Sequence, residues 1–218
     1  MKVNSLLFFL AIGLLLGCDE NMKKVTEPGS GPESMEQTPS DTLQEEETIT
    51  IEKIAEMASN GKLSSKFSDS EMQKEIASIN EGMDSVKVIW LNRNSKDAVR
   101  IDFQPKDSTK VFRVTVEGKE NKFHSEKGVE LGMTIDELNS ANRKPVDFYG
   151  FNWDFSGAVK FNNGQLENEK IRVYVKTDKK YGNQFIGDTP HTFEEAKAAK
   201  LELYVGKIIF EPSKSRQL

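Results

Sequence analysis

The sequence predicts an α+β fold in which helices pack on one face of an antiparallel sheet. Apolar residues recur at helical spacing behind short capping motifs in several segments. Between these segments apolar and polar residues alternate, as they do in half-buried strands. Because a helix followed by three strands occurs twice, we expect two similar helix-plus-meander halves, at about residues 49–122 and 123–218.

The first half begins with a predicted helix over residues 50–59, whose apolar face is formed by Ile51, Ile54, Ala55 and Ala58. A second helix is predicted after the capping box Ser68-Asp69-Ser70-Glu71, with Met72, Ile76 and Ile79 on its apolar side. From Val86 onward the apolar period changes to two. We therefore expect a three-stranded meander, with strands near residues 86–90, 99–103 and 112–116.

The second half repeats this order. The capping box Thr134-Ile135-Asp136-Glu137 starts a short helix with Ile135, Leu138 and Ala141 inward, and Pro145 closes it. Strands are predicted at residues 146–155, 157–161 and 170–175, with a turn at Asn162-Asn163-Gly164. The box Thr192-Phe193-Glu194-Glu195 predicts a last helix, and a final strand over residues 201–210 is expected to be interrupted near Gly206.

Charge divides the chain into segments. The formal net charge is -5, but residues 18–48 hold nine acidic and two basic residues, while residues 49–218 hold 26 acidic and 27 basic ones. The acidic segment lacks aromatic residues and apolar periodicity, so we expect a disordered tether. The near-neutral domain gives no electrostatic reason to expect nucleic-acid binding. A mean hydropathy of -0.57 argues against a polytopic membrane protein.

The amino terminus predicts export and lipidation. Residues 1–17 combine Lys2 with an apolar run over residues 6–16, which is too short to span a bilayer and reads as a signal peptide. The run ends in Leu15-Leu16-Gly17-Cys18, which resembles the lipobox of bacterial lipoproteins. That resemblance implies cleavage before Cys18, the one cysteine in the chain, and its acylation. A coincidental cysteine after an ordinary signal, or an uncleaved anchor helix, is the alternative interpretation.

A second resemblance lies in the second half. Gly132-Met133-Thr134-x-x-Glu137-Leu138, with Pro145, is similar to a signature of small outer-membrane-assembly lipoproteins of the SmpA/BamE type and of β-lactamase-inhibitor-like domains. Asn142 and Arg143 stand where those families usually have an aliphatic residue and glycine. Residues 125–175 also resemble uncharacterised bacterial lipoproteins, through Gly128, Asn142, Lys144 and the run Phe148-Tyr149-Gly150-Phe151-x-Trp153-Asp154. These resemblances imply a fold and leave the function open.

The candidate binding residues are Tyr149, Phe151, Trp153 and Phe155, four aromatic residues at period two. On a strand they would share one face and could stack on sugar or on a protein partner. The alternative is that they form the core beneath the short helix, or that Trp153-Asp154 begins a tight turn before Gly157. Lys170, Arg172 and Lys176, with Lys179-Lys180 beyond, predict a basic strand face that is either solvated or in contact with an acidic partner or lipid headgroups.

The sequence contains no assembled catalytic motif. His124 and His191 lack metal-ligand spacing, and neither a Gly-x-Ser-x-Gly nor a Gly-x-x-x-x-Gly-Lys motif is present. We therefore predict no metal, no cofactor and no enzymatic activity. The expected function is that of a lipid-anchored cell-envelope protein, on the outer membrane in preference to the inner, that binds an envelope protein. The alternatives are a carboxylate-dependent glycan hydrolase and a carbohydrate-binding module.

Overall fold

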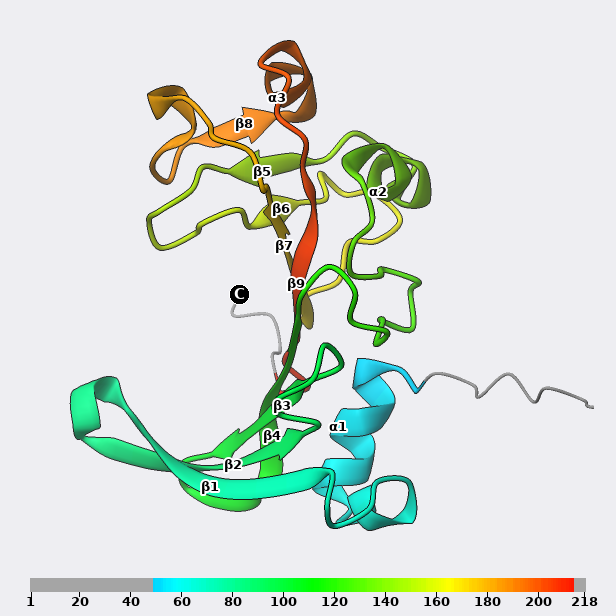
Figure 1. The fold of residues 1–218 in the computed structure, drawn as a ribbon, viewed down its shortest axis with the longest axis vertical. Helices are drawn as coiled ribbons and strands as arrows, with labels where there is room; N and C mark the ends of the chain where they lie inside the picture. The colour runs from blue at the N-terminus through cyan, green and yellow to red at the C-terminus, as the bar shows by residue number, and fades with distance from the viewer. Residues whose placement is uncertain (1–48, 214–218) are drawn as a thin grey trace, which may run out of the picture. The chain divides into compact units, whose positions relative to one another are not determined.

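The computed structural model describes residues 49–213. The predicted signal peptide, the lipidation of Cys18 and the acidic tether lie outside the described residues. The described elements follow the order α1, β1–β4, α2, β5–β7, β8, α3, β9, with short 3-10 turns between them (Figure 1). The strand pairs are antiparallel, and the expected α+β class is confirmed.

The larger sheet has six strands and draws on both halves of the sequence. Its spatial order is β1 (Met72–Ile79), β2 (Asp84–Leu91), β3 (Val99–Gln104), β4 (Asp107–Glu117), β9 (Tyr204–Phe210) and β7 (Ile171–Lys176). The predicted strands at residues 86–90, 99–103 and 112–116 lie within β2, β3 and β4. β9, from the end of the second half, pairs with β4 and so carries β7 into the same sheet.

Helix α1 (Ile51–Ser59) packs against β4 and is the helix predicted for residues 50–59. Thr50 caps it, since its side chain accepts the backbone N–H of Lys53 at 3.3 Å. The expected apolar residues Ile51, Ile54, Ala55 and Ala58 are all buried, together with Met57. An amphipathic sequence with a polar cap therefore forms the predicted helix on the predicted face.

The helix predicted after Ser68 is wrong, because residues 72–79 form the strand β1. One of the two reciprocal bonds of the capping box forms, since the backbone N–H of Ser68 donates to Glu71 Oε2 at 2.8 Å. The N–H of Glu71 donates to the backbone carbonyl of Ser68 instead of to its hydroxyl, which itself donates to Glu71 Oε2 at 2.7 Å. Beyond them the chain extends, and all eight residues of β1 pair with β2. Ladder pairing with β2 outweighs the weak local helix preference, which tertiary context routinely overrides.

A smaller three-stranded sheet belongs to the second half. It consists of β6 (Val159–Lys160), β5 (Asp147–Tyr149) and β8 (Pro190–Thr192) in that order. Helices α2 (Ile135–Asn142) and α3 (Phe193–Ala198) begin at the two predicted capping boxes, each with both reciprocal hydrogen bonds present. The strand predicted over residues 146–155 is wrong beyond Tyr149, and that predicted over 157–161 is shortened to β6.

The last strand contains the irregularity expected at Gly206. Tyr174 of β7 pairs with Lys207 and Val175 pairs with Val205, which leaves Gly206 as a bulge in an otherwise continuous β9. A Cβ atom at Gly206 would lie 2.5 Å from Cγ of Lys176, so a side chain would displace that lysine. The bulge changes the direction of β9 without ending its pairing.

Backbone hydrogen bonds at Gly132 and Met133, just before α2, connect this part of the chain to β9 of the larger sheet. The backbone N–H of Gly132 donates to the carbonyl of Val205 at 2.8 Å, and the N–H of Val205 donates to the carbonyl of Met133 at 2.8 Å. Gly132 has a φ of +85°, and a Cβ there would lie 2.5 Å from the carbonyl oxygen of Lys119. The glycine of the Gly-Met-Thr motif is thus required by backbone conformation and by a close backbone approach.

Helix α2 ends at the two positions that depart from the resemblance. The side chain of Asn142, which is fully buried, donates to the carbonyls of Lys144 and Phe161 and accepts the N–H of Leu166. Arg143 adopts a left-handed conformation, with a φ of 55°, at the position where helices usually place glycine. Asn142 therefore organises the chain that follows α2.

One apolar cluster joins the elements of residues 49–213. It includes buried side chains of α1, of both sheets and of α2 and α3, among them Ile54, Leu91, Ile101, Leu138, Phe148 and Val205. No helix within these residues is long and apolar enough to cross a bilayer.

Candidate functional site

The four predicted aromatic residues do not share one face of a strand. The chain leaves β5 after Tyr149 and turns before β6, so the row lies mostly in a loop that we call the aromatic loop, residues 150–158. Phe151 is buried, with 6% of its surface exposed, whereas Trp153 is 65% and Phe155 is 53% exposed. The prediction of a single aromatic face is wrong, since one ring is core and two are surface.

Phe151 belongs to an aromatic cluster inside the second half. Its ring centroid lies 5.9 Å from that of Phe148 and 4.8 Å from that of Tyr181. Phe148 in turn lies 6.2 Å from Phe185 and 5.8 Å from His191. These separations are typical of favourable aromatic packing, so the cluster holds Phe151, and with it the start of the aromatic loop, in the core.

Backbone hydrogen bonds fix both ends of the aromatic loop. On one side, the N–H of Phe151 donates to the carbonyl of Phe185 at 2.7 Å, and the N–H of Gly187 donates to the carbonyl of Phe151 at 2.9 Å. On the other side, the N–H of Val175 in β7 donates to the carbonyl of Gly157 at 2.8 Å. A Cβ at Gly157 would lie 2.2 Å from the carbonyl oxygen of Val175, so the approach to β7 needs glycine.

Side chains fix the tip of the loop. The N–H of Asn152 donates to the Ser156 hydroxyl at 3.1 Å, and the Tyr181 hydroxyl donates to Asn152 Oδ1 at 3.0 Å. The N–H of Phe155 donates to Asp188 Oδ1 at 3.0 Å. The exposed rings therefore stand on a backbone that is held in place before any ligand arrives, which lowers the entropic cost of binding.

The aromatic patch of this region is defined as the exposed Trp153 and Phe155 together with the half-buried Tyr149. The rings of Tyr149 and Phe155 lie 5.0 Å apart at an interplanar angle of 32°, and Lys160 Nζ lies 6.0 Å from the centre of the Tyr149 ring. Ile186, 41% exposed, belongs to the segment that pairs with Phe151. Sequence reasoning missed Tyr181, Ile186 and Asp188, because no local pattern links them to a loop 30 residues earlier.

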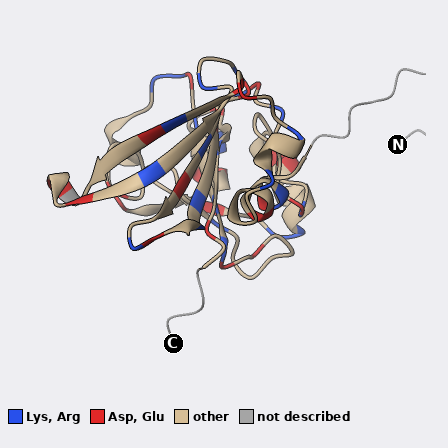
Figure 2. Cartoon of the chain, turned by 90° about the horizontal axis from the view of Figure 1, so that it is seen from below, with Lys and Arg blue, Asp and Glu red and all other residues tan. Residues whose placement is uncertain are grey.

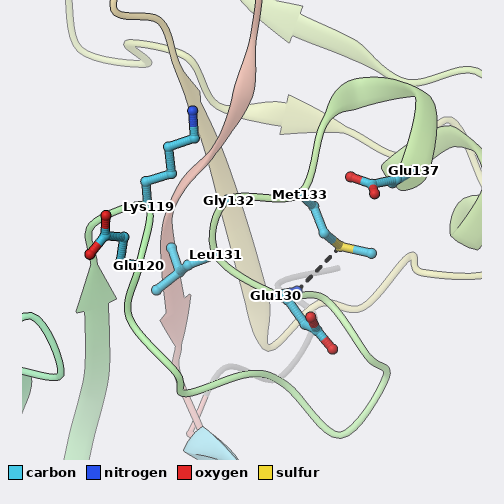
Figure 3. Close-up of a pocket in the computed structure, with 7 residues that line it drawn as sticks. All are labelled: Lys119, Glu120, Glu130, Leu131, Gly132, Met133 and Glu137. Atoms are coloured by element: carbon cyan, nitrogen blue, oxygen red, sulfur yellow. Dashed lines mark hydrogen bonds between the residues drawn. The ribbon is translucent and has the colours of Figure 1, made fainter.

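A separate hollow lies beside the Gly-Met-Thr motif (Figure 3). Its volume is about 640 Å³, and its lining comprises Lys119, Glu120, Glu130, Leu131, Gly132, Met133 and Glu137. Glu137 accepts the N–H of Thr134 at 2.7 Å, and this bond holds the pKa of Glu137 below its usual value. A glycosidase acid needs a raised pKa instead. Burial raises the pKa of Glu52 in α1, and Glu52 does not line the hollow.

The predicted basic strand face carries its own counterions. Arg172 and Lys176 lie on the same face of β7 and form ion pairs with Glu211 and with Glu117, the second at 3.2 Å. Lys179 lies 3.7 Å from Glu202. Figure 2 shows basic and acidic positions close together on the strands of the larger sheet. This arrangement neutralises most of the positive charge that the sequence places on β7.

The two histidines lie in different settings. His124 forms an isolated bridge with Glu130, while His191 in β8 is buried against Phe148 and Phe185. Among residues 49–213 no group of three or more His, Cys, Asp and Glu residues is placed to hold a metal ion. Cys18, the predicted lipidation site, falls outside the described part of the chain.

Comparison of the whole chain with models of known families, with curated proteins and with solved structures found no match.

Proposed function

We propose that this protein is a lipid-anchored cell-envelope protein, held on the outer membrane, that binds another envelope protein through the aromatic patch and performs no catalysis. The observation that carries the proposal is the exposure of Trp153 and Phe155 on a loop whose backbone is fixed at its ends and at its tip.

Exposed aromatic rings on a rigid loop suit a protein interface. Trp and Tyr are enriched among the residues that dominate binding energies, and they supply large apolar areas with few rotatable bonds. Polar groups surround the patch, including Asn152, Asp154 and Lys160, as the rim of an interface requires. Glu137, the one residue of α2 that lines the hollow, is engaged in capping that helix, which removes a candidate for acid catalysis there.

The anchor is proposed from the sequence. Three acyl chains on Cys18, each contributing about 0.8 kcal/mol per buried CH2, would hold the chain on a membrane far more firmly than one chain does. A flexible tether of residues 19–48 would have a mean reach of about 30 Å. Cys18→Ala is expected to move the protein from the membrane pellet to the soluble fraction. Unchanged pelleting would refute the anchor while leaving the patch untouched.

The patch is tested by a photocrosslinking amino acid placed at Trp153 in living cells. The matched control places the same amino acid at Phe112 of β4, which is 43% exposed and lies on the other half of the chain. We expect one protein adduct from position 153 and none from 112, with adduct loss on Phe155→Ala. The purified adduct partner should then bind the unsubstituted chain at least about tenfold more tightly than the Trp153→Ala chain.

A carbohydrate-binding role is the second candidate. It is favoured by Asn152 and Asp154, the exposed polar residues that precede and follow the exposed Trp153 in the sequence, because sugar recognition combines stacking with hydrogen bonds. Titration of the full chain with soluble peptidoglycan fragments separates the two candidates. Saturable binding that Trp153→Ala abolishes, without a protein adduct, would replace the protein-binding proposal by this one.

We also infer that the two halves are related as helix-plus-strand units with helices on one face of the sheet. What supports this is the order α1 then β1–β4, and α2 then β5–β7. Because β9 pairs with β4, the test keeps the chain whole. If the halves are distinct units, hydrogen exchange should show α1 with β1–β4 and α2 with β5 and β6 losing protection at different urea concentrations. Loss of protection in a single step would count against it.

A further inference from the structure

We propose that two copies of this chain associate by pairing their β1 strands antiparallel, with Ile76 facing Ile76 of the other copy at the centre of the contact. This interaction surface lies on the first half and is independent of the aromatic patch.

β1 is an open edge of the larger sheet. It pairs with β2 along one side, and within residues 49–213 no strand pairs with its other side. The opposite edge strand, β7, is partly covered, since Val175 hydrogen-bonds to Gly157 and Tyr174 bridges to Ala158. An uncovered row of backbone N–H and C=O groups is a template for a further strand.

β1 lacks the usual features that prevent edge pairing. It contains no proline, and its register with β2 runs without a bulge from Met72 to Ile79. The carboxylate of Glu75 is already engaged, accepting Trp90 Nε1 at 2.9 Å and Arg93 Nη1 at 2.6 Å. Lys74 is thus the one remaining charge along the strand, while Ile76 is 72% exposed.

Symmetry restricts the pairing to a few registers. If the β1 strands of two copies join into one continuous antiparallel sheet, the two-fold axis that relates the copies is perpendicular to the sheet. The β1 residue on that axis then pairs with the same residue of the other copy. Centring on Lys74 or on Glu75 would place like charges directly opposite each other, which is destabilising. Centring on any residue nearer to an end of β1 would pair at most three residues of each strand. The centres that remain are Ile76 and Ala77.

Overlap and apolar contact select Ile76. Centred there, residues 73–79 of both copies pair, and Lys74 faces Ser78. Centred on Ala77, pairing shrinks to residues 75–79 and leaves Ile76 opposite a serine. In the Ile76 register two exposed β-branched side chains meet, and such cross-strand pairs stabilise sheets. The strand is therefore self-complementary about Ile76, and this argues for a second copy over an unrelated strand.

Disulfide formation tests the register in the full chain. Residues directly opposite in antiparallel strands have Cα atoms about 4.5–5.5 Å apart, within the range that a disulfide bridges. Ile76→Cys, oxidised with copper phenanthroline in detergent, is expected to give a disulfide-linked dimer in more than half of the molecules. Met83→Cys is the control, since Met83 is 80% exposed and lies beyond the end of β1. Oxidation of the unsubstituted chain serves as a second control, because any dimer that it forms must be linked through Cys18.

The molar mass tests the association itself. Light scattering of the unsubstituted full chain should give a dimer, and Ile76→Lys, which opposes two ammonium groups, should raise the dissociation constant at least about tenfold. Met83→Lys should leave it unchanged, and an unaltered far-UV circular dichroism spectrum excludes unfolding. A monomeric unsubstituted chain would overturn the proposal. So would an Ile76→Cys product linked to a different protein, because β1 would then pair with another partner.

Discussion

Replacing Asn142 with alanine should cost far more stability than its position at the end of a short helix suggests. Its side-chain amide makes three hydrogen bonds: Nδ2 donates to the carbonyls of Phe161 at 2.9 Å and Lys144 at 3.0 Å, and Oδ1 accepts the N–H of Leu166 at 3.1 Å. Asn142 itself is 0% exposed. Alanine leaves the buried N–H of Leu166 without a partner, whereas the carbonyl of Phe161 keeps the N–H of Gly164 at 2.9 Å. We therefore expect a loss of about 1–3 kcal/mol.

Urea unfolding followed by tryptophan fluorescence measures this loss. The matched control is Asn168→Ala, because Asn168 Oδ1 accepts a single exposed N–H, that of Lys170 at 2.9 Å, and should cost less than about 1 kcal/mol. Asn142→Leu should also destabilise, since Gly164 approaches the amide so closely that a Cβ there would lie 2.2 Å from it. A loss below about 1 kcal/mol for Asn142→Ala would refute the reasoning, because it would mean that the buried N–H of Leu166 finds another partner.

Three further predictions concern the aromatic loop, the last residue of α2 and the capping box at its first turn. Phe151→Ala should cost about 3–5 kcal/mol in the same urea assay, whereas Trp153→Ala should change stability by less than about 0.5 kcal/mol; equal losses would contradict the division between core and surface. Arg143→Gly should stabilise the protein by up to about 1 kcal/mol, seen as a higher Tm, and a lower Tm would contradict the strain assigned to its left-handed backbone. The hydrogen bond from the Thr134 N–H holds the pKa of Glu137 below its usual 4.5. The ionised Glu137 carboxylate therefore stabilises the folded protein above pH 4.5, and this stabilisation is lost as the pH falls through the lowered pKa. Glu137→Gln keeps a side-chain oxygen that can accept the Thr134 N–H but has no carboxylate to titrate. Between about pH 5 and acid pH the variant should therefore lose less stability than the unsubstituted chain. Identical dependence of unfolding free energy on pH in the two proteins would refute this.

Helix starts were the most predictable features of this chain. The boxes at Thr134 and Thr192 form both of their reciprocal hydrogen bonds, and α2 and α3 begin there as predicted. These bonds join groups three residues apart, so the sequence alone contains all of their participants. The box at Ser68 shows the limit of this reasoning, because only one of its two reciprocal bonds forms and the helix does not follow.

The candidate site was predictable in location and not in geometry. Period two placed Tyr149, Phe151, Trp153 and Phe155 on one strand, but the strand ends at Tyr149. Phe151 is buried because it meets Phe185 and Tyr181, which arrive from residues more than 25 positions later. Periodicity describes which side chains share a face only as long as the backbone stays extended.

Local sequence patterns were enough to predict the α+β class, α1 with its buried face, the starts of α2 and α3, and the irregularity at Gly206. Each of these depends on residues within a few positions of one another. Tertiary structure alone decided that residues 72–79 are a strand, since the partner that satisfies their backbone lies in β2. It also decided which aromatic rings face solvent. Burial of a ring depends on residues from distant parts of the chain that pack against it, and short-range sequence patterns do not identify those residues.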